Sequence, residues 1–77
     1  MTEQVIQILE QVTDHKGIHP DTDLLEEDLL DSLALIELMN ELEAAFHVEI
    51  QPTQVPSDTW QTAERIAKMV EALRKKD

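Results

Sequence analysis

Ser32 is the residue of this sequence best placed for covalent chemistry, because it lies within the leucine-rich, acidic run DLLDSLALIELMNEL at residues 28–42. A serine nucleophile needs a neighbouring base, usually histidine, and a third group that orients the base. The histidines of the chain are His15, His19 and His47. On one straight helix His47 would stand about 20 Å from Ser32, since each residue adds about 1.5 Å. The other two flank the expected end of a different helix, so the pattern does not predict a catalytic triad.

Metal-ligand patterns are equally incomplete in this sequence. The segment DTDLLEEDLLDS, residues 21–32, has carboxylates at its first and third positions, as a calcium loop does. Its fifth, sixth and twelfth positions hold leucine, glutamate and serine, where such a loop needs a ligand, a glycine and a glutamate. His15 and His19 are four residues apart, but Gly17 lies between them, so they form a weak transition-metal pair. We therefore predict no metal site.

Composition narrows the class of protein further. A chain of 77 residues is long enough for one small domain, residues 1–77, and such a domain buries only about 60% of its unfolded surface. That leaves little room for a shielded catalytic pocket. The sequence has no cysteine, which excludes a disulfide framework and a thiolate metal site. It also lacks an apolar run of about 18 residues and a basic-then-apolar leader, so we expect a cytoplasmic monomer that is not inserted in a membrane.

Charge is both strongly negative and unevenly distributed. The formal net charge is −11, and residues 21–50 hold ten of the 17 carboxylates and no Lys or Arg. Five of the six cations fall within residues 62–77. Nucleic acid is an unsuitable partner, because binding phosphates needs clustered cations. An acidic field favours encounters with basic protein partners. The alternative is a solvated surface that only keeps the protein soluble.

Hydrophobic spacing predicts helices and no strands. We expect helices at residues 2–15, 32–46 and 63–75, a short helical turn near residues 57–60, and a long irregular connection at residues 16–31. The fold class predicted is therefore all-α, a small four-helix bundle. It consists of three main helices and one short helix, which is third in chain order. Leucines of the connection are expected to fold back over the core: Leu24, Leu25, Leu29 and Leu30. The residues expected in the core itself are Leu35, Met39, Leu42, Phe46, Trp60, Ile66, Val70 and Leu73.

The helix ends carry recognisable capping residues. Thr2 and Thr62 are expected to cap the first and last helices, and the cations Arg74, Lys75 and Lys76 suit the negative end of the last helix. Either Asp31 or Ser32 could cap the second helix. A helix N-terminus also favours a bound phosphate, because its free amides and the helix dipole stabilise negative charge. Ser32 is thus either a simple cap or the attachment point of a phosphodiester.

The run LLDSLALIEL, residues 29–38, is similar to the Asp-Ser-Leu motif of the acyl and peptidyl carrier proteins. Nearly the whole chain matches the element order of that family. The resemblance implies that a phosphopantetheinyl transferase attaches the 4′-phosphopantetheine of coenzyme A to Ser32. The thiol of that arm would carry an acyl group between enzymes, so the protein would be a carrier and not itself an enzyme. The residues implied as contacts for partner enzymes are Asp31, Leu33, Ile36 and Glu37.

Within the family, VPSDTWQTAERI at residues 55–66 resembles the D-alanyl carrier proteins of Gram-positive bacteria through Asp58, Trp60 and Thr62. Ala63 stands where those proteins often have proline. The resemblance implies two further partners, a D-alanine-activating ligase that uses ATP and a membrane acyltransferase system that D-alanylates (lipo)teichoic acid. Two alternatives remain open. One is an acyl or aminoacyl carrier for fatty acid, polyketide or nonribosomal peptide synthesis, and the other is a small acidic helical adaptor without a prosthetic group.

Overall fold

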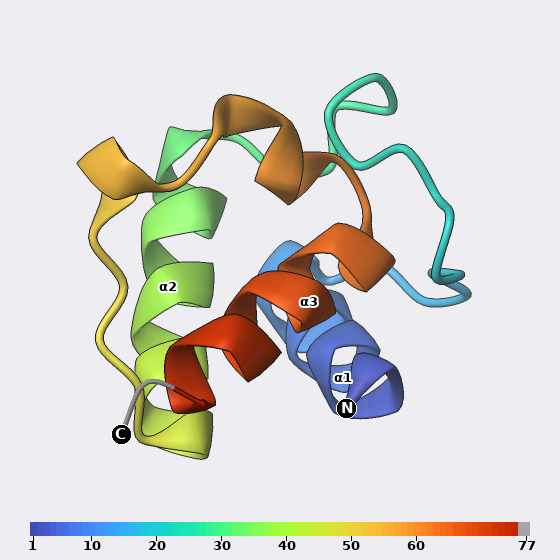
Figure 1. The fold of residues 1–77 in the computed structure, drawn as a ribbon. Coiled ribbons are helices and arrows are strands. Elements are labelled where there is room, and N and C mark those ends of the chain that lie inside the picture. Colours follow the sequence, from blue (N-terminus) through green and yellow to red (C-terminus); the bar gives the residue numbers. More distant parts are fainter. Residues whose placement is uncertain (76–77) are drawn as a thin grey trace.

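The fold, seen in a computed structural model that describes residues 1–75, consists of helices joined by loops (Figure 1). The elements in chain order are α1 (Thr2–Thr13), α2 (Ser32–Phe46), the 3₁₀ helices η1 (Pro52–Gln54) and η2 (Ser57–Gln61), and α3 (Ala63–Arg74). No strand occurs among the described residues. The all-α prediction is confirmed, and the short third helix is η2. The start of α2 and η2 lie at the same end of the molecule, at the top of Figure 1.

α2 has the bounds that the sequence predicts. It begins after Asp31, whose backbone is extended and whose side chain accepts a hydrogen bond from the Ala34 amide. It ends at His47, which adopts the left-handed conformation (φ 55°) that commonly terminates a helix. Both signals lie within a few residues of the helix, which is why the sequence alone could locate them.

α1 ends two residues earlier than expected, and its predicted cap is wrong. The helix stops at Thr13 because Asp14 takes the left-handed conformation, with φ 56°. Met1, not Thr2, precedes the first helical residue, and it makes no side-chain capping bond. The predicted cap of α3 is confirmed, since the Thr62 hydroxyl accepts a hydrogen bond from the Arg65 amide. Lys75 follows the last residue of α3, and Lys76 lies outside the described residues.

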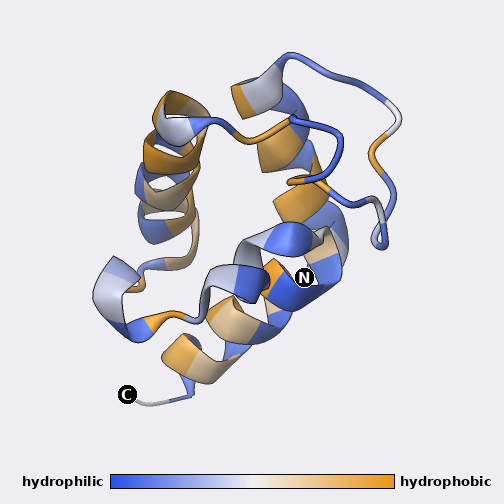
Figure 2. Ribbon diagram, turned by 90° about the horizontal axis from the view of Figure 1, so that it is seen from above, coloured by the Kyte–Doolittle hydropathy of each residue, from blue (hydrophilic) through white to orange (hydrophobic). Residues whose placement is uncertain are grey.

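The hydrophobic core joins all three α-helices and the long connection. Figure 2 shows hydrophobic residues at intervals along the loops as well as on the helices. α1 packs against both α2 and α3. The largest fully buried side chains among the described residues are those of Val5, Leu9, Leu24, Leu38, Leu42, Ile66 and Val70.

Most of the predicted core residues are buried, but three of them lie at its edge. Leu42, Phe46, Trp60, Ile66 and Val70 are buried as expected. Leu35, Met39 and Leu73 are only partly buried and pack against the core from outside. Leu38 occupies the central position on α2 instead. Because α2 carries apolar residues around most of its circumference, its sequence does not specify which stripe faces α1 and α3.

The long connection folds back over the core as predicted, with one exception. Leu24 and Leu30 are buried and Leu29 is partly buried, whereas the Leu25 side chain is 46% exposed. The chain turns through Asp28, which has a positive φ of 58°. Leu24 therefore lies inward and its neighbour Leu25 lies outward. Within residues 1–75, no helix is long and apolar enough to span a membrane.

Leu38→Ala should lower the free energy of unfolding by about 2–5 kcal/mol, because it removes a fully buried side chain and leaves a cavity. Leu33→Ala on the same helix removes a side chain that is 74% exposed and should change stability by less than about 0.5 kcal/mol. Urea denaturation of both variants measures the difference. Equal losses would contradict the orientation of α2.

Candidate functional site

Ser32 is the first residue of α2, and its side chain is exposed. Asp31 supplies the cap: its Oδ1 accepts a hydrogen bond from the Ala34 amide at 2.8 Å, and its carbonyl accepts one from the Leu35 amide at 2.9 Å. The Ser32 hydroxyl takes part in none of the side-chain hydrogen bonds among residues 1–75. Of the two alternatives for the cap, Asp31 is correct, and Ser32 is left with a free hydroxyl.

A short turn at residues 24–30 leads the chain into Ser32. The buried Leu24 anchors it, because its carbonyl accepts hydrogen bonds from the amides of Leu29 and Leu30 at 2.9 and 3.4 Å. Asp28 supplies the left-handed residue that the turn requires, without a glycine. Leu30 is two residues before Ser32, so this anchor sets the path of the chain immediately before the hydroxyl.

Two large apolar side chains lie exposed beside Ser32 on α2. Leu33 is 74% exposed and Ile36 is 52% exposed. Leu33, Ile36 and Glu37 are spaced by three and four residues, so they share one face of the helix. Sequence reasoning singled out these residues, and they lie on the surface within two turns of Ser32. The sequence did not predict that Leu25 is exposed, because Leu24 and Leu25 are adjacent leucines and no nearby residue distinguishes them.

None of the three histidines makes a hydrogen bond to the Ser32 hydroxyl among the described residues. His47 follows the last residue of α2, at the opposite end of the helix from Ser32. His15 is exposed, and its Nδ1 lies 3.1 Å from the Thr13 carbonyl. His19 is also exposed, and its amide donates to the Thr22 hydroxyl. Among the described residues, no three His, Asp or Glu side chains are grouped so that they could hold a metal ion.

The site therefore presents an accessible hydroxyl at the positive end of a helix dipole. A phosphate ester fits this position, because first-turn amides and the dipole stabilise negative charge. The Asp31 carboxylate is the nearest anion along the chain, and it is already held by the Ala34 amide. The exposed Ser32 hydroxyl at this helix end is thus a candidate attachment point for a phosphodiester.

Comparison with protein families identifies the class of protein to which the chain belongs. Residues 3–70 match the model of the phosphopantetheine attachment site family. This chain belongs to that family. Its prosthetic group is therefore 4′-phosphopantetheine, and the carrier-protein resemblance seen in the sequence is confirmed.

Curated relatives narrow the resemblance within the family. The chain is 42% identical to the D-alanyl carrier protein of Lactococcus lactis subsp. lactis, over all of this chain and 98% of the relative. It is 40% identical to that of Lactococcus lactis subsp. cremoris, with 92% of each chain covered. It is 34% identical to that of Listeria welshimeri, over 94% of this chain and 95% of the relative. The resemblance to D-alanyl carrier proteins extends over nearly the whole length.

Asp31→Ala should lower the free energy of unfolding by about 1 kcal/mol, because it removes the side-chain cap of α2. Ser32→Ala should change it by less than about 0.5 kcal/mol, since the exposed hydroxyl contributes no cap. Urea denaturation of the unmodified protein and both variants measures the two effects. A larger loss for Ser32→Ala than for Asp31→Ala would show that the serine is the cap.

Proposed function

We propose that this protein is a D-alanyl carrier protein, with 4′-phosphopantetheine attached to Ser32. It receives D-alanine as a thioester from an ATP-dependent D-alanine ligase and delivers it to the membrane acyltransferase system that D-alanylates (lipo)teichoic acid. The observation that carries the proposal is the free, exposed hydroxyl of Ser32 at the start of α2, in a chain similar end to end to D-alanyl carrier proteins. Residues 1–77 act as a single carrier domain.

The attachment step needs only one group from this chain. The Ser32 oxygen attacks the pyrophosphate of coenzyme A, and the oxygen forms a phosphodiester with the pantetheine phosphate as adenosine 3′,5′-bisphosphate leaves. The phosphopantetheinyl transferase takes the hydroxyl proton, since none of the three histidines hydrogen-bonds the Ser32 hydroxyl. The chain has no cysteine, so the arm supplies the thiol that holds the cargo. The protein is accordingly a carrier that the partner enzymes act on.

The partner enzymes are proposed to contact the exposed start of α2. Leu33 and Ile36 provide an apolar contact beside the attachment point. Asp31 and Glu37 border it with negative charge, and residues 21–50 contain no Lys or Arg to offset that charge. A partner with an apolar depression and a basic rim complements this surface, because charge complementarity favours the encounter and apolar burial supplies affinity.

Incubation with coenzyme A and a phosphopantetheinyl transferase should add one phosphopantetheine to the wild-type protein and none to Ser32→Ala, since the hydroxyl is the nucleophile. Intact mass spectrometry measures the gain. The matched control Ser57→Ala removes an exposed serine of η2 and should be modified as the wild type is. An unchanged wild-type mass with several broad-specificity transferases would favour the adaptor without a prosthetic group.

Ile36→Glu should raise the KM of the ligase for the phosphopantetheinylated carrier about tenfold, which corresponds to about 1.4 kcal/mol of lost contact. The substitution places a charge in the proposed apolar contact. Ala72→Glu adds the same charge at an exposed position of α3 and should leave the KM unchanged. The rate of thioester formation with ATP and labelled D-alanine is the measurement.

The same assay identifies the cargo. Loading with D-alanine and not with L-alanine supports the D-alanyl assignment. Loading only by fatty acid, polyketide or peptide synthesis enzymes would place the carrier in another pathway.

An Ile36→Glu protein that loads as well as the wild type would show that the start of α2 is not part of the contact surface.

A further inference from the structure

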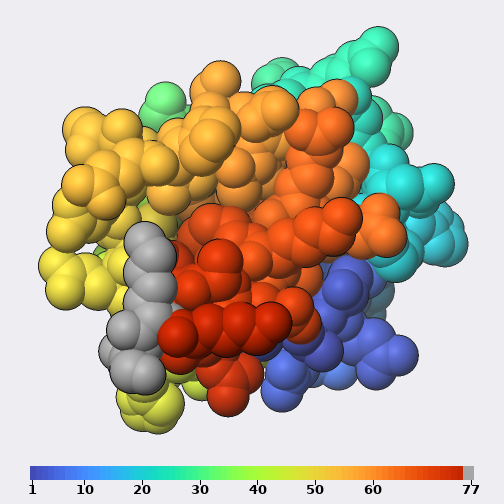
Figure 3. All heavy atoms as spheres, viewed as in Figure 1, coloured from blue at the N-terminus to red at the C-terminus, as the bar shows by residue number. Residues whose placement is uncertain are grey.

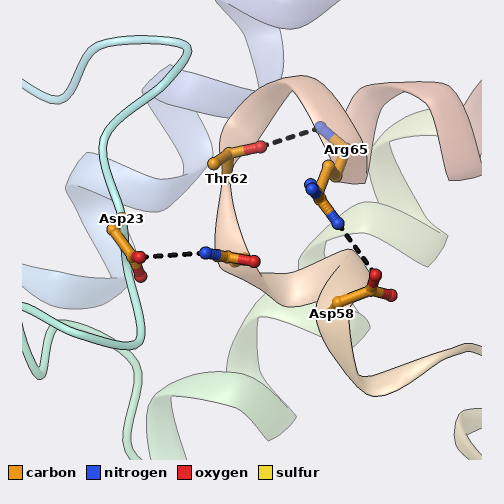
Figure 4. Close-up of polar contacts among 5 residues, drawn as sticks. Asp23, Asp58, Thr62 and Arg65 are labelled. Atoms are coloured by element: carbon orange, nitrogen blue, oxygen red, sulfur yellow. Dashed lines mark hydrogen bonds and ion pairs between the residues drawn. The ribbon is translucent and has the colours of Figure 1, made fainter.

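The corner between η2 and α3 is braced by side chains that the attachment chemistry does not use. Asp58 of η2 and Arg65 of α3 form an ion pair, with Oδ2 and Nη1 2.8 Å apart (Figure 4). The Thr62 hydroxyl accepts a hydrogen bond from the Arg65 amide at 3.2 Å. The Trp60 side chain is buried in the core and is 6% exposed. Asp58, Trp60 and Thr62 are the residues through which the segment resembles D-alanyl carrier proteins, and they flank Gln61 in the sequence.

The long connection is fastened to this corner by three hydrogen bonds. The Leu24 amide donates to the Gln61 carbonyl at 2.7 Å, and the Glu64 amide donates to the Pro20 carbonyl at 3.1 Å. The third bond runs between side chains, from Gln61 Nε2 to Asp23 Oδ2 at 2.9 Å (Figure 4). Figure 3 shows the connection, in cyan, lying against the orange segment that contains the corner. The corner is thus the anchor of an otherwise irregular loop.

One carboxylate links the corner to the turn that precedes Ser32. Asp23 uses Oδ2 for Gln61 and Oδ1 for the Glu26 amide, at 2.9 Å. The Glu26 amide and the Gln61 side chain both stabilise the ionised form, so they lower the pKa of Asp23. Their contribution to stability is complete above the ordinary aspartate pKa, which is 3.8, and is lost as the pH falls through the lower folded value. At neutral pH the link is therefore charged and intact.

The chain of contacts continues from Asp23 to the attachment point. Leu24 follows Asp23 and receives, at its carbonyl, the amides of Leu29 and Leu30. Only Asp31 then separates Leu30 from Ser32. Displacing Asp23 from the corner would leave the 24–30 turn tied to the corner only by the hydrogen bond of the Leu24 amide.

We propose that Gln61 is a positioning residue for Ser32: through Asp23 it holds the 24–30 turn in the conformation that partner enzymes accept. This inference rests on the proposed function, because it concerns the enzymes that modify and load Ser32. A carrier whose accepted conformation is only partly populated binds its enzymes with an apparent affinity reduced by that fraction. The chemistry within the bound complex is unchanged. Loss of the Gln61 contact should therefore alter KM and not kcat.

Gln61→Glu tests this most directly, because it places a second carboxylate against Asp23 and replaces attraction with repulsion. We expect the KM for the carrier in the phosphopantetheinyl transfer reaction to rise about fivefold, with kcat unchanged, as the accepted conformation falls to about one fifth of the population. Hydrogen exchange at the Glu26, Leu29 and Leu30 amides should accelerate, while exchange within α1 stays as in the wild type. Gln54→Glu adds the same charge at an exposed position of η1 and should change neither readout.

A second substitution provides a rescue. When Asp23→Asn is combined with Gln61→Glu, the side-chain carbonyl of the new asparagine can still accept from the Glu26 amide. Its NH₂ group can donate to the carboxylate introduced at position 61. This reversed hydrogen bond should return the KM and the exchange rates to wild-type values. A KM that stays high in a folded double variant would overturn the pairing.

The outcomes separate this inference from the function on which it rests. A wild-type protein that is never modified overturns the proposed function. A modified wild type whose Gln61→Glu variant keeps the wild-type KM overturns the positioning role alone. Should Gln61→Glu lose its circular dichroism spectrum, Gln61→Leu removes the donor without adding charge: a raised KM then supports the role and an unchanged KM overturns it.

Discussion

The hydrogen bond from the Ala34 amide to the Asp31 carboxylate is the interaction on which the proposed function depends. It starts α2 at Ser32 and satisfies one of the amides that every helix leaves free at its first turn. A serine in this position would ordinarily be expected to do the capping itself. Because the preceding aspartate does so, the Ser32 hydroxyl remains accessible at the helix end. Asp31 thus caps the helix, and the adjacent Ser32 keeps an accessible hydroxyl.

A thin core limits how such a hydroxyl can be positioned. The connection from α1 to α2 contains no regular element, yet it ends at Ser32, the proposed attachment point. Burial of Leu24 and its backbone hydrogen bonds give the connection a fixed point. The corner at η2 and α3 supplies the fastening from a distant part of the chain. A loop held by a few discrete bonds is also one that a single substitution can release.

Negative charge and exposed apolar side chains occur in the same segment of the chain. Large apolar side chains on a surface invite non-specific association, and Leu33 and Ile36 are both largely exposed. They lie in a region of the sequence that contains only negative charges, which opposes contact between like copies and favours basic partners. The cations of α3 belong to a different part of the chain, where Arg65 is already paired with Asp58. In the proposed interaction, selectivity for a partner therefore depends on the charges around the apolar contact as much as on the contact itself.

The sequence by itself determined the features that depend on neighbours within about four residues. These are the bounds of α2, the Thr62 cap of α3 and the helical turn that contains Trp60. It left open whether Asp31 or Ser32 caps α2, because both residues have the right chemistry at adjacent positions. Only the tertiary structure decided that Leu38 and not Leu35 or Met39 occupies the centre of the core, since α2 is apolar on several sides. Only it brought Asp23 to Gln61, 38 residues away, because contacts across such a separation form through packing of the whole chain and leave no periodic trace in the sequence.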